Sequence, residues 1–321
     1  MNIKSLILIS SLIGSACFAQ TNSANPYNRS KVDRVPSRIV HSFDRFTFLE
    51  SIASGPDDSL YATSLFEGIL YRQKDGVATK LTTLDGMLAG LTFADDNHLL
   101  VTGTSKQEGP LVLRVNTTSG NSEIIARFPE AKLLNGITKL SDGVFLIADS
   151  FKGVIWKLDI KNGATSLWLD HDLLHSPAPE KQQPGVNGIK LHNHAIYISN
   201  TNKKLLVKIP LNANQSPATP EIVHENIFMD DFEIASDGTL YGATHIYDSI
   251  IKITPKGDVS VIAQSDQGVA GSTCLTWKQG SGSILFVSTN GGMNSTPDRC
   301  NVVPSKIVQL NLAPRPSLKN I

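Results

Sequence analysis

Hydrophobic and polar residues alternate along most of this chain in pairs of short segments, each pair separated by a tight turn. The clearest pair spans residues 134–150, where Asp142-Gly143 separates an alternating segment from one rich in Val, Phe, Leu and Ile. This pattern predicts a β-hairpin, because glycine adopts the backbone angles of such a turn without steric cost.

The same hairpin pattern recurs along the chain, and a third strand-like segment and usually a fourth follow each copy. Aligned at a common first residue, the six copies begin at positions 50, 89, 135, 187, 230 and 273, in steps of 39 to 52 residues. Four strands in a unit of about 40–50 residues are typical of a β-propeller blade. The sequence therefore predicts an all-β, six-bladed β-propeller over residues 37–313, with four-stranded antiparallel blades around a central channel. The rival fold, a two-sheet sandwich, does not predict a regular four-strand period.

Two further patterns indicate how the blades pack and how the ring closes. An apolar residue recurs two places after the alignment point in four copies and is expected to pack between blades: Leu91, Ile137, Ile189 and Phe232. Strand-like residues 37–48 precede the first copy, whereas little strand-like sequence follows the last predicted strand at 305–310. The N-terminal segment is therefore expected to supply the outer strand of blade six and to remove an open sheet edge.

The two ends of the chain fall outside the predicted propeller. Residues 1–19 contain a short uncharged apolar run that closes on Cys17-Phe18-Ala19, which is typical of a secretory signal peptide cleaved after Ala19. The alternative is a lipoprotein acylated at Cys17. Residues 20–36 are polar and predict a flexible leader, and residues 314–321 a C-terminal tail. We therefore expect a secreted protein, extracellular or, in a bacterial host, periplasmic.

Composition excludes two classes of partner. With 29 basic and 29 acidic residues the formal net charge is zero, so no net field attracts nucleic acid or an anionic membrane. After the signal peptide, no segment approaches the ~18 apolar residues that a membrane helix needs. We expect a monomer whose partner is a small-molecule ligand or substrate.

Export also affects the cysteines and the glycosylation motifs. Cys274 and Cys300 remain after the signal peptide, and in an oxidising compartment they are a candidate disulfide; a buried Cys274 thiol is the alternative. Asn-x-Ser/Thr sequons are candidate glycan sites only in a eukaryotic host. They occur at Asn28, Asn116, Asn214 and Asn294.

Candidate chemistry comes from the position at which each copy begins. In a propeller the first strand of each blade lines the channel, so these six residues point toward a common axis: Glu50, Ala89, Asn135, Asn187, Asp230 and Thr273. Two carboxylates and two carboxamides form an all-oxygen set, which hard divalent cations prefer. Turn chemistry is the alternative for the Asn-Gly and Asp-Asp pairs, but it does not account for Glu50 in the same register.

The chain resembles the gluconolactonase/regucalcin (senescence marker protein) family of six-bladed propellers over its whole mature length. The resemblance rests on four motifs in order: Leu49-Glu50-Ser51, Asn135-Gly136, Asn187-Gly188 and Met229-Asp230-Asp231-Phe232. It implies that Glu50, Asn135, Asn187 and Asp230 hold one divalent cation, foremost Ca²⁺, with Mg²⁺, Mn²⁺ or Zn²⁺ as alternatives. Asp230 is preferred to Asp231 because it keeps the seven-residue spacing to the following Asp-Gly turn. Residues 288–292 are similar to secreted fungal members.

The chain departs from this family at positions that bear on the substrate. Asp231 stands where the family has Gly, Ser51-Ile52 replaces Ser-Pro, and no Arg occurs in the run 131–134 before the first Asn motif. The four ligand residues are kept despite these departures, so the cation is still expected, whereas a sugar-specific pocket is in doubt.

The resemblance implies hydrolysis of a lactone or ester, with the cation polarising the carbonyl. Asp230 is the candidate general base, His245 the candidate proton shuttle or oxyanion donor, and Glu50 mainly a charge-neutralising ligand. Loops after the second strands add a mixed rim for a small organic ligand: Phe66, Asp149, Phe151, Asn200, His245, Tyr247 and Asn290. The alternative is a metal-bearing propeller without a hydrolytic role that binds a small molecule or a partner.

Overall fold

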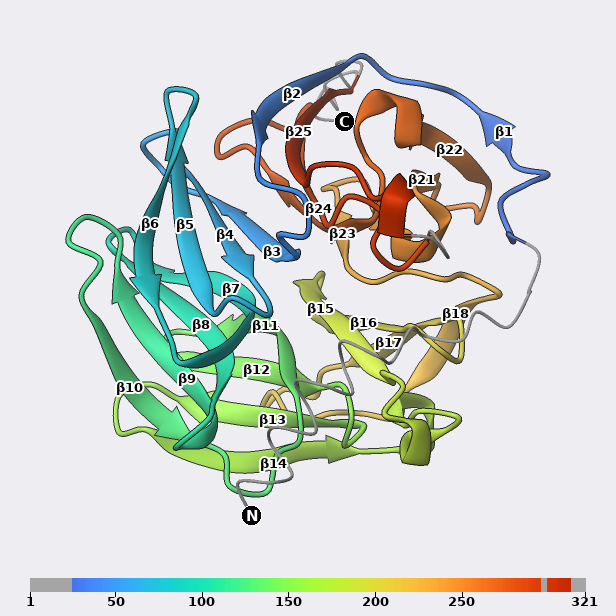
Figure 1. Ribbon diagram of the computed structural model, residues 1–321. Helices are drawn as coiled ribbons and strands as arrows, with labels where there is room; N and C mark the ends of the chain where they lie inside the picture. The colour runs from blue at the N-terminus through green and yellow to red at the C-terminus, as the bar shows by residue number, and fades with distance from the viewer. Residues whose placement is uncertain (1–24, 296–298, 313–321) are drawn as a thin grey trace.

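The computed structural model describes residues 25–295 and 299–312, which form six twisted sheets arranged in a ring (Figure 1). Every sheet contains four consecutive antiparallel strands in space, so the predicted six-bladed β-propeller is confirmed and the sandwich is excluded. The predicted signal peptide (1–19) and C-terminal tail (314–321) lie outside the described residues.

Apart from two N-terminal strands described below, the strands of each blade run from the channel outward in chain order. Blades one and two comprise β3 (Leu49–Ser54), β4 (Leu60–Ser64), β5 (Ile69–Lys74), β6 (Val77–Thr83), β7 (Gly86–Asp95), β8 (His98–Ser105), β9 (Gly109–Asn116) and β10 (Ser122–Arg127). Blades three and four comprise β11 (Leu134–Ser141), β12 (Val144–Asp149), β13 (Val154–Asp159), β14 (Ala164–Asp170), β15 (Val186–His192), β16 (Ala195–Asn200), β17 (Leu205–Pro210) and β18 (Glu221–Glu225). Blades five and six comprise β19 (Phe232–Ile234), β20 (Leu240–Ala243), β21 (Ser249–Ile253), β22 (Val259–Gln264), β23 (Ser272–Trp277), β24 (Ile284–Thr289) and β25 (Lys306–Asn311).

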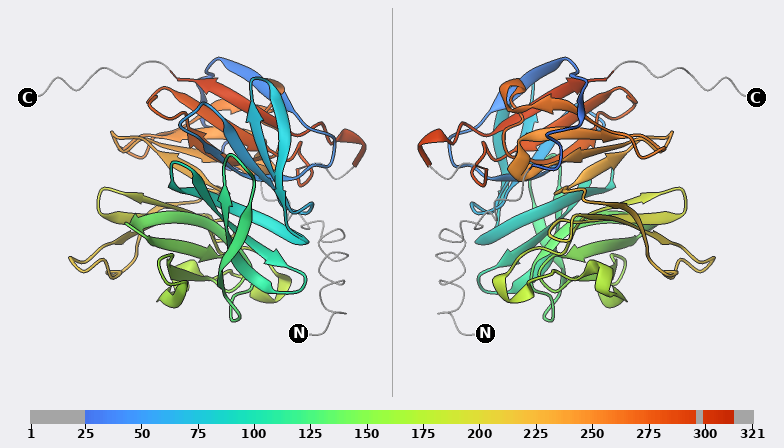
Figure 2. Two further views of the ribbon diagram at one scale, coloured as in Figure 1. Left: turned by 90° about the vertical axis from the view of Figure 1, so that its left-hand side faces the viewer. Right: turned by 90° about the vertical axis from the view of Figure 1, so that its right-hand side faces the viewer.

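The ring closes through the N-terminal segment, as the sequence predicts. Strand β2 (Ser37–Ser42) pairs antiparallel with β25 and completes blade six, and the two strands lie side by side in Figures 1 and 2. The first strands of successive blades contact one another around the channel, and β23 contacts β3. One blade therefore joins the two ends of the chain, which leaves no open edge at the join.

Residues 25–36 differ from the flexible leader that the sequence predicts. Strand β1 (Lys31–Val32) pairs in parallel with β22 and adds a fifth strand to blade five. The Tyr27 side chain is buried, packs edge-on against Tyr247, and donates its hydroxyl hydrogen bond to Phe228 O at 2.6 Å. Strand pairing and the buried Tyr27 together order this segment, and average composition reveals neither contact.

The apolar residues predicted to pack between blades do so. Leu91 of blade two is buried in one cluster with Ala53 and Tyr61 of blade one, and Ile189 of blade four in another with Leu146 of blade three. Ile137 and Phe232 are buried between neighbouring blades in the same way. The hydrophobic core is thus a set of layers between successive sheets.

The remaining regular elements are short 3-10 helices on the connections: η1 (Asp172–Leu174), η2 (Pro179–Lys181), η3 (His245–Tyr247), η4 (Ser265–Gln267) and η5 (Arg299–Asn301). Among the described residues, no helix has the length and apolar character that crossing a membrane requires.

The predicted disulfide is wrong for the described part of the chain. Cys274 is buried, Cys300 is exposed, and no disulfide joins them. The Cys274 sulfur instead lies 2.9 Å from Asp231 Oδ2, inside the ring. Both cysteines belong to blade six, but one side chain faces the channel while the other is on a surface connection, so proximity in the blade does not bring the sulfurs together.

Candidate functional site

Irregular strand pairing positions the residues that the sequence singled out. In blades one, three and four, the pairing of the first strand with the second jumps over Glu50-Ser51, Asn135-Gly136 and Asn187-Gly188. Such β-bulges redirect side chains and are common next to active sites. The three polar residues therefore lie within strands, and their side chains are not turn-forming groups.

The glycines that follow the two asparagines allow neighbouring blades to approach closely. A Cβ on Gly136 would lie 2.4 Å from Asn187 O, and a Cβ on Gly188 would lie 2.4 Å from Asp231 Oδ1. A side chain at either position would push the blades apart. The Asn-Gly pairs thus combine a polar group at the channel with close packing between blades.

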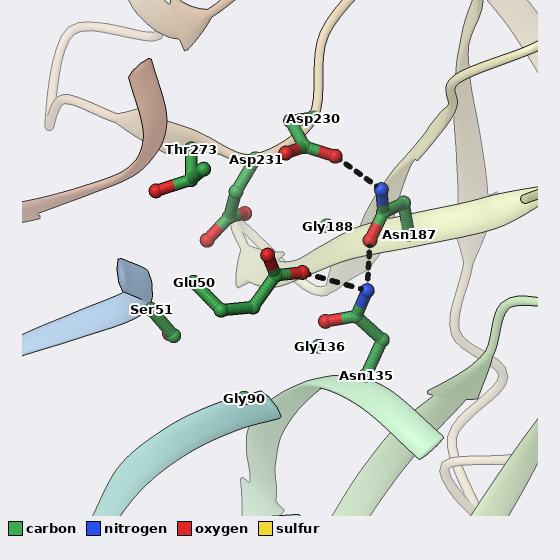
Figure 3. A pocket seen from close by; sticks show the side chains of 10 residues that line it. All are labelled: Glu50, Ser51, Gly90, Asn135, Gly136, Asn187, Gly188, Asp230, Asp231 and Thr273. Atoms are coloured by element: carbon green, nitrogen blue, oxygen red, sulfur yellow. Dashed lines mark hydrogen bonds between the residues drawn. The ribbon is translucent and has the colours of Figure 1, made fainter. Parts of the chain in front are cut away.

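All four predicted ligand residues converge at the channel, and their side chains form a continuous hydrogen-bonded arc (Figure 3). Asn135 Nδ2 donates to Glu50 Oε1 at 3.2 Å and to Asn187 Oδ1 at 2.6 Å. Asn187 Nδ2 donates to Asp230 Oδ1 at 2.5 Å. The arc borders a cavity of about 20 Å³, which suffices for one species the size of a water molecule or an ion.

Electrostatics at this arc are dominated by buried negative charge. Burial and, after it, the charge of the Asp230 carboxylate raise the pKa of Glu50 to about 8, and His245 and the Asn135 hydrogen bond oppose this shift only in part. Glu50 and Asp230 therefore lie close together, and the positive charge around them is too small for both to ionise at their ordinary pKa values.

Asp231 also borders the cavity, but it has its own positive partner. Lys190 Nζ lies 3.2 Å from Asp231 Oδ2 and 3.4 Å from Glu233 Oε1. Burial alone would lower the pKa of Lys190, but these two carboxylates raise it above its ordinary value. Asp231 Oδ2 also accepts a hydrogen bond from the Cys274 thiol. Asp230 faces Asn187 and His245 instead, so the two adjacent aspartates have different surroundings.

Sequence reasoning missed Lys190 and Glu233 for a structural reason. In a regular strand, side chains alternate, so Lys190 would point away from the channel that Asn187 faces. The bulge at Asn187-Gly188 shifts this alternation by one residue and turns Lys190 inward. A positive residue three places after a channel Asn is the only sequence signal, and it becomes readable only once the bulge is known.

His245 Nδ1 lies 3.0 Å from Asp230 Oδ2. Its other ring nitrogen accepts hydrogen bonds from Asn290 Nδ2 at 2.8 Å and Asn294 Nδ2 at 3.2 Å. Backbone N–H groups of residues 292 and 293 donate to Asn290 Oδ1, which fixes the orientation of that amide and, through it, the neutral tautomer with the proton on Nδ1.

The charge state of His245 results from opposing influences. Burial lowers its pKa, whereas the charge and hydrogen bond of Asp230 raise it above the ordinary value. The two amide donors at Nε2 oppose protonation, because that nitrogen must then give up its acceptor role. Both ring nitrogens are therefore engaged within the protein, and His245 holds one oxygen of Asp230.

Most polar residues predicted at the rim are used within the fold. Asp149 is fully buried and accepts from the backbone N–H groups of Lys132 and Leu133 and from Trp156 Nε1. Asn200 is also fully buried and donates to the carbonyl oxygens of residues 173 and 175. Phe66 remains exposed.

The donor set fits a hard divalent cation. Within the described residues, no group of three or more His, Cys, Asp or Glu side chains is arranged to hold a metal. The arc, however, adds two carboxamides to Glu50 and Asp230, and its cavity is of ionic size. Carboxylate and carboxamide oxygens are the ligands that Ca²⁺ and Mg²⁺ prefer, and a cation would offset the repulsion that raises the pKa of Glu50.

Comparison with known proteins supports the fold and offers two directions for function. No family model matches the chain. A protein from Sarocladium schorii that is provisionally named a hetero-Diels-Alderase is 25% identical over 281 residues, which covers 71% of this chain and 70% of that protein.

The structural relatives include a calcium-binding regucalcin from Agrobacterium tumefaciens, with a TM-score of 0.69 at 16% identity over 88% of this chain and 96% of that chain. A gluconolactonase from Xanthomonas campestris has a TM-score of 0.66 at 13% identity over 88% of this chain and 92% of that chain. The fold is thus that of the regucalcin and gluconolactonase propellers, as the sequence motifs indicated; the similarity to fungal members stays a prediction.

Proposed function

We propose that this protein is a secreted, divalent-cation-dependent hydrolase of a lactone or ester. The observation that carries the proposal is the convergence of Glu50, Asn135, Asn187 and Asp230 on one ion-sized cavity. The likeness of the fold to a calcium-binding regucalcin and to a gluconolactonase supports the same direction.

In this proposal Glu50, Asn135, Asn187 and Asp230 hold the cation, foremost Ca²⁺, with Mg²⁺, Mn²⁺ or Zn²⁺ as alternatives. When bound, the cation supplies Lewis acidity toward the substrate carbonyl. Both Asn amides are held in place by neighbouring side chains, which keeps the polar arc rigid before the ligand arrives.

Asp230 acts as the general base. Its carboxylate accepts a proton from the water that attacks the carbonyl carbon, and it returns this proton to the alkoxide when the ring C–O bond breaks, so that a hydroxy acid forms. His245 is a positioning residue, because its Nδ1–H holds Asp230 Oδ2 at 3.0 Å and leaves the other oxygen toward Asn187.

The first test combines elemental analysis of the purified protein with a panel of lactones and esters. We expect one divalent ion per chain, loss of turnover with a chelator, and a kcat/KM about 100-fold lower in Asp230→Asn. Asp231→Asn is the matched control and should retain calcium affinity, because Asp231 is paired with Lys190. Equal effects of both substitutions would remove Asp230 from its special role.

A second candidate is a hetero-Diels-Alder cyclisation, which the 25% identity to the Sarocladium schorii protein favours. A carboxyl group whose pKa is raised to about 8 is protonated at neutral pH and can donate a hydrogen bond to the carbonyl of a heterodiene. Crotonaldehyde with ethyl vinyl ether is a suitable probe pair. Cyclisation that persists with a chelator and declines above pH 8 would favour this function over hydrolysis.

The non-catalytic alternative, a propeller that only binds a small molecule, predicts ligand-induced thermal stabilisation without turnover. Export and a monomeric state are part of the main proposal. N-terminal sequencing of the protein from culture medium should give Gln20 as the first residue, and light scattering should give the mass of one chain. A chain that keeps residues 1–19 would contradict secretion through a cleaved signal peptide.

A further inference from the structure

Aromatic residues lead outward from the Asp230–His245 pair. The Phe48 ring packs edge-on against the His245 ring at a centroid distance of 5.8 Å, and the Phe66 ring packs edge-on against Phe48 at 5.2 Å. Phe48 is buried, whereas Phe66 is 45% exposed. A continuous aromatic path therefore connects the proposed base to the surface.

The residues of this path belong to connections at one face of the ring. Phe48 directly precedes β3, Phe66 lies between β4 and β5, and His245 lies between β20 and β21. The backbone hydrogen bond from Leu65 N to Phe48 O at 2.8 Å fastens the first two connections to each other. Phe48 and Phe66 are thus part of the scaffold of blade one, and His245 meets them from blade five.

Two residues at or near this path adopt left-handed backbone angles. His245 has a φ of 47°, and Phe46, two residues before Phe48, has a φ of 71° and is 48% exposed. Bulky residues rarely adopt left-handed angles, and where they do, the surrounding structure fixes them, often at ligand-binding sites. Exposed aromatic surface and strained backbone therefore coincide beside the proposed base.

The polar residues that the sequence predicts at this rim are used within the protein. Asp149 and Asn200 are fully buried and use their side chains on the protein itself, and Asn290 binds His245 and its own loop. Buried polar groups that are already paired do not reach a ligand hydroxyl. Among the predicted rim residues Phe66 is the most exposed, and Phe151 and Tyr247 are half-buried.

We propose that Phe66, held in place by the buried Phe48, forms a subsite for an aryl or long alkyl group of the substrate. The substrate is then an aromatic or alkyl-substituted lactone or ester and not a polyhydroxylated sugar lactone. The class of the reacting group rests on the proposed function, whereas the apolar subsite rests on the aromatic path alone.

The test measures binding of prodan, a neutral naphthyl ketone whose fluorescence shifts to the blue in apolar surroundings, to the full-length mature protein. Phe66→Ala should weaken prodan binding about tenfold, because it removes an aromatic contact surface. Phe66→Tyr should keep it. Val77→Ala is the matched control, since Val77 is 61% exposed on outer strand β6. Phe66 is half exposed, so the melting temperature should stay near that of the parent.

Competition identifies the substrate class. 3,4-Dihydrocoumarin, an aromatic lactone, should displace prodan, whereas glucono-1,5-lactone should not. Unchanged prodan affinity in Phe66→Ala, or displacement by glucono-1,5-lactone, would overturn the subsite. If prodan binding depends on Phe66 but no lactone or ester is hydrolysed, the subsite stands and the proposed hydrolase function fails.

Discussion

Two groups of buried acids share the channel, and they differ in how their charge is balanced. In the arc of Glu50, Asn135, Asn187 and Asp230, the carboxylates receive hydrogen bonds mainly from neutral amides, and the pKa of Glu50 is raised to about 8. A few residues away, Asp231 and Glu233 share the Lys190 ammonium.

The difference separates a site that can accept a cation from a cluster that already contains one. Removing charges from water is costly unless an opposite charge is fixed nearby. Lys190 fulfils this need for Asp231 and Glu233, so the second group is a completed ion-pair cluster. Among the described residues, the ion pair of the first group is that of His245 with Asp230. The negative charge of Glu50 and Asp230 is therefore not fully balanced, and a bound divalent ion would balance it.

The largest expected effect follows from removal of the internal cation. Lys190→Met leaves Asp231 and Glu233 without their shared partner, so the free energy of unfolding should fall by roughly 3 kcal/mol. Urea denaturation measures this loss. The control is Lys208→Met, whose ion pair with Glu221 is at the surface and should contribute below about 1 kcal/mol. Similar small losses in both variants would mean that the Lys190 cluster is not needed for charge balance.

A moderate effect should appear in the pH dependence of stability without added metal. The pKa of Glu50 rises from 4.5 to about 8 on folding, so the folded state binds the extra proton. Stability from this group is fully present below pH 4.5 and is lost as the pH rises toward 8. Thermal melts in chelator should therefore show a declining midpoint over this range, and excess Ca²⁺ should counter the decline.

Glu50→Gln is the informative variant for this pH dependence, because it removes the titrating group and keeps its size. Its melting midpoint should vary less with pH than that of the parent chain. A parent midpoint that instead rises steadily between pH 5 and 8 in chelator would contradict the assignment of a raised Glu50 pKa.

The smallest effect concerns the thiols. Burial raises the pKa of Cys274 well above its ordinary value, and the charge of Asp231 adds to the shift, so the thiol should stay protonated and unreactive in the folded protein. With a thiol-specific reagent, Cys300 should react at once and Cys274 only after unfolding. Cys300→Ser should abolish the fast phase. Rapid reaction of both thiols, or a disulfide in a non-reducing peptide map, would contradict the structure.

The fold was accessible from sequence because a propeller repeats one local pattern. Hairpins with Asp-Gly turns and a period of about 40–50 residues indicate blades, and the extra strand at 37–48 indicated the closure that β2 provides. Alignment of the repeats also placed Glu50, Asn135 and Asn187 at one channel, since equivalent positions of a repeat point to a common axis. The ordered leader and the separate cysteines were missed, because each depends on a few contacts between residues far apart in the chain.

The sequence by itself determined the number of blades, the closing strand and the set of oxygen-bearing residues at the channel. Only the tertiary structure decided which neighbour each residue meets. In the folded chain Asp231 pairs with Lys190 and Asp230 pairs with His245. Both ring nitrogens of His245 are in contact with neighbouring side chains. The physical reason is that a bulge in β15 shifts the alternation of side chains by one residue and turns Lys190 toward Asp231 of the next blade. His245 meets Asp230 within blade five and Asn290 of blade six through connections between strands, so no local pattern records these contacts.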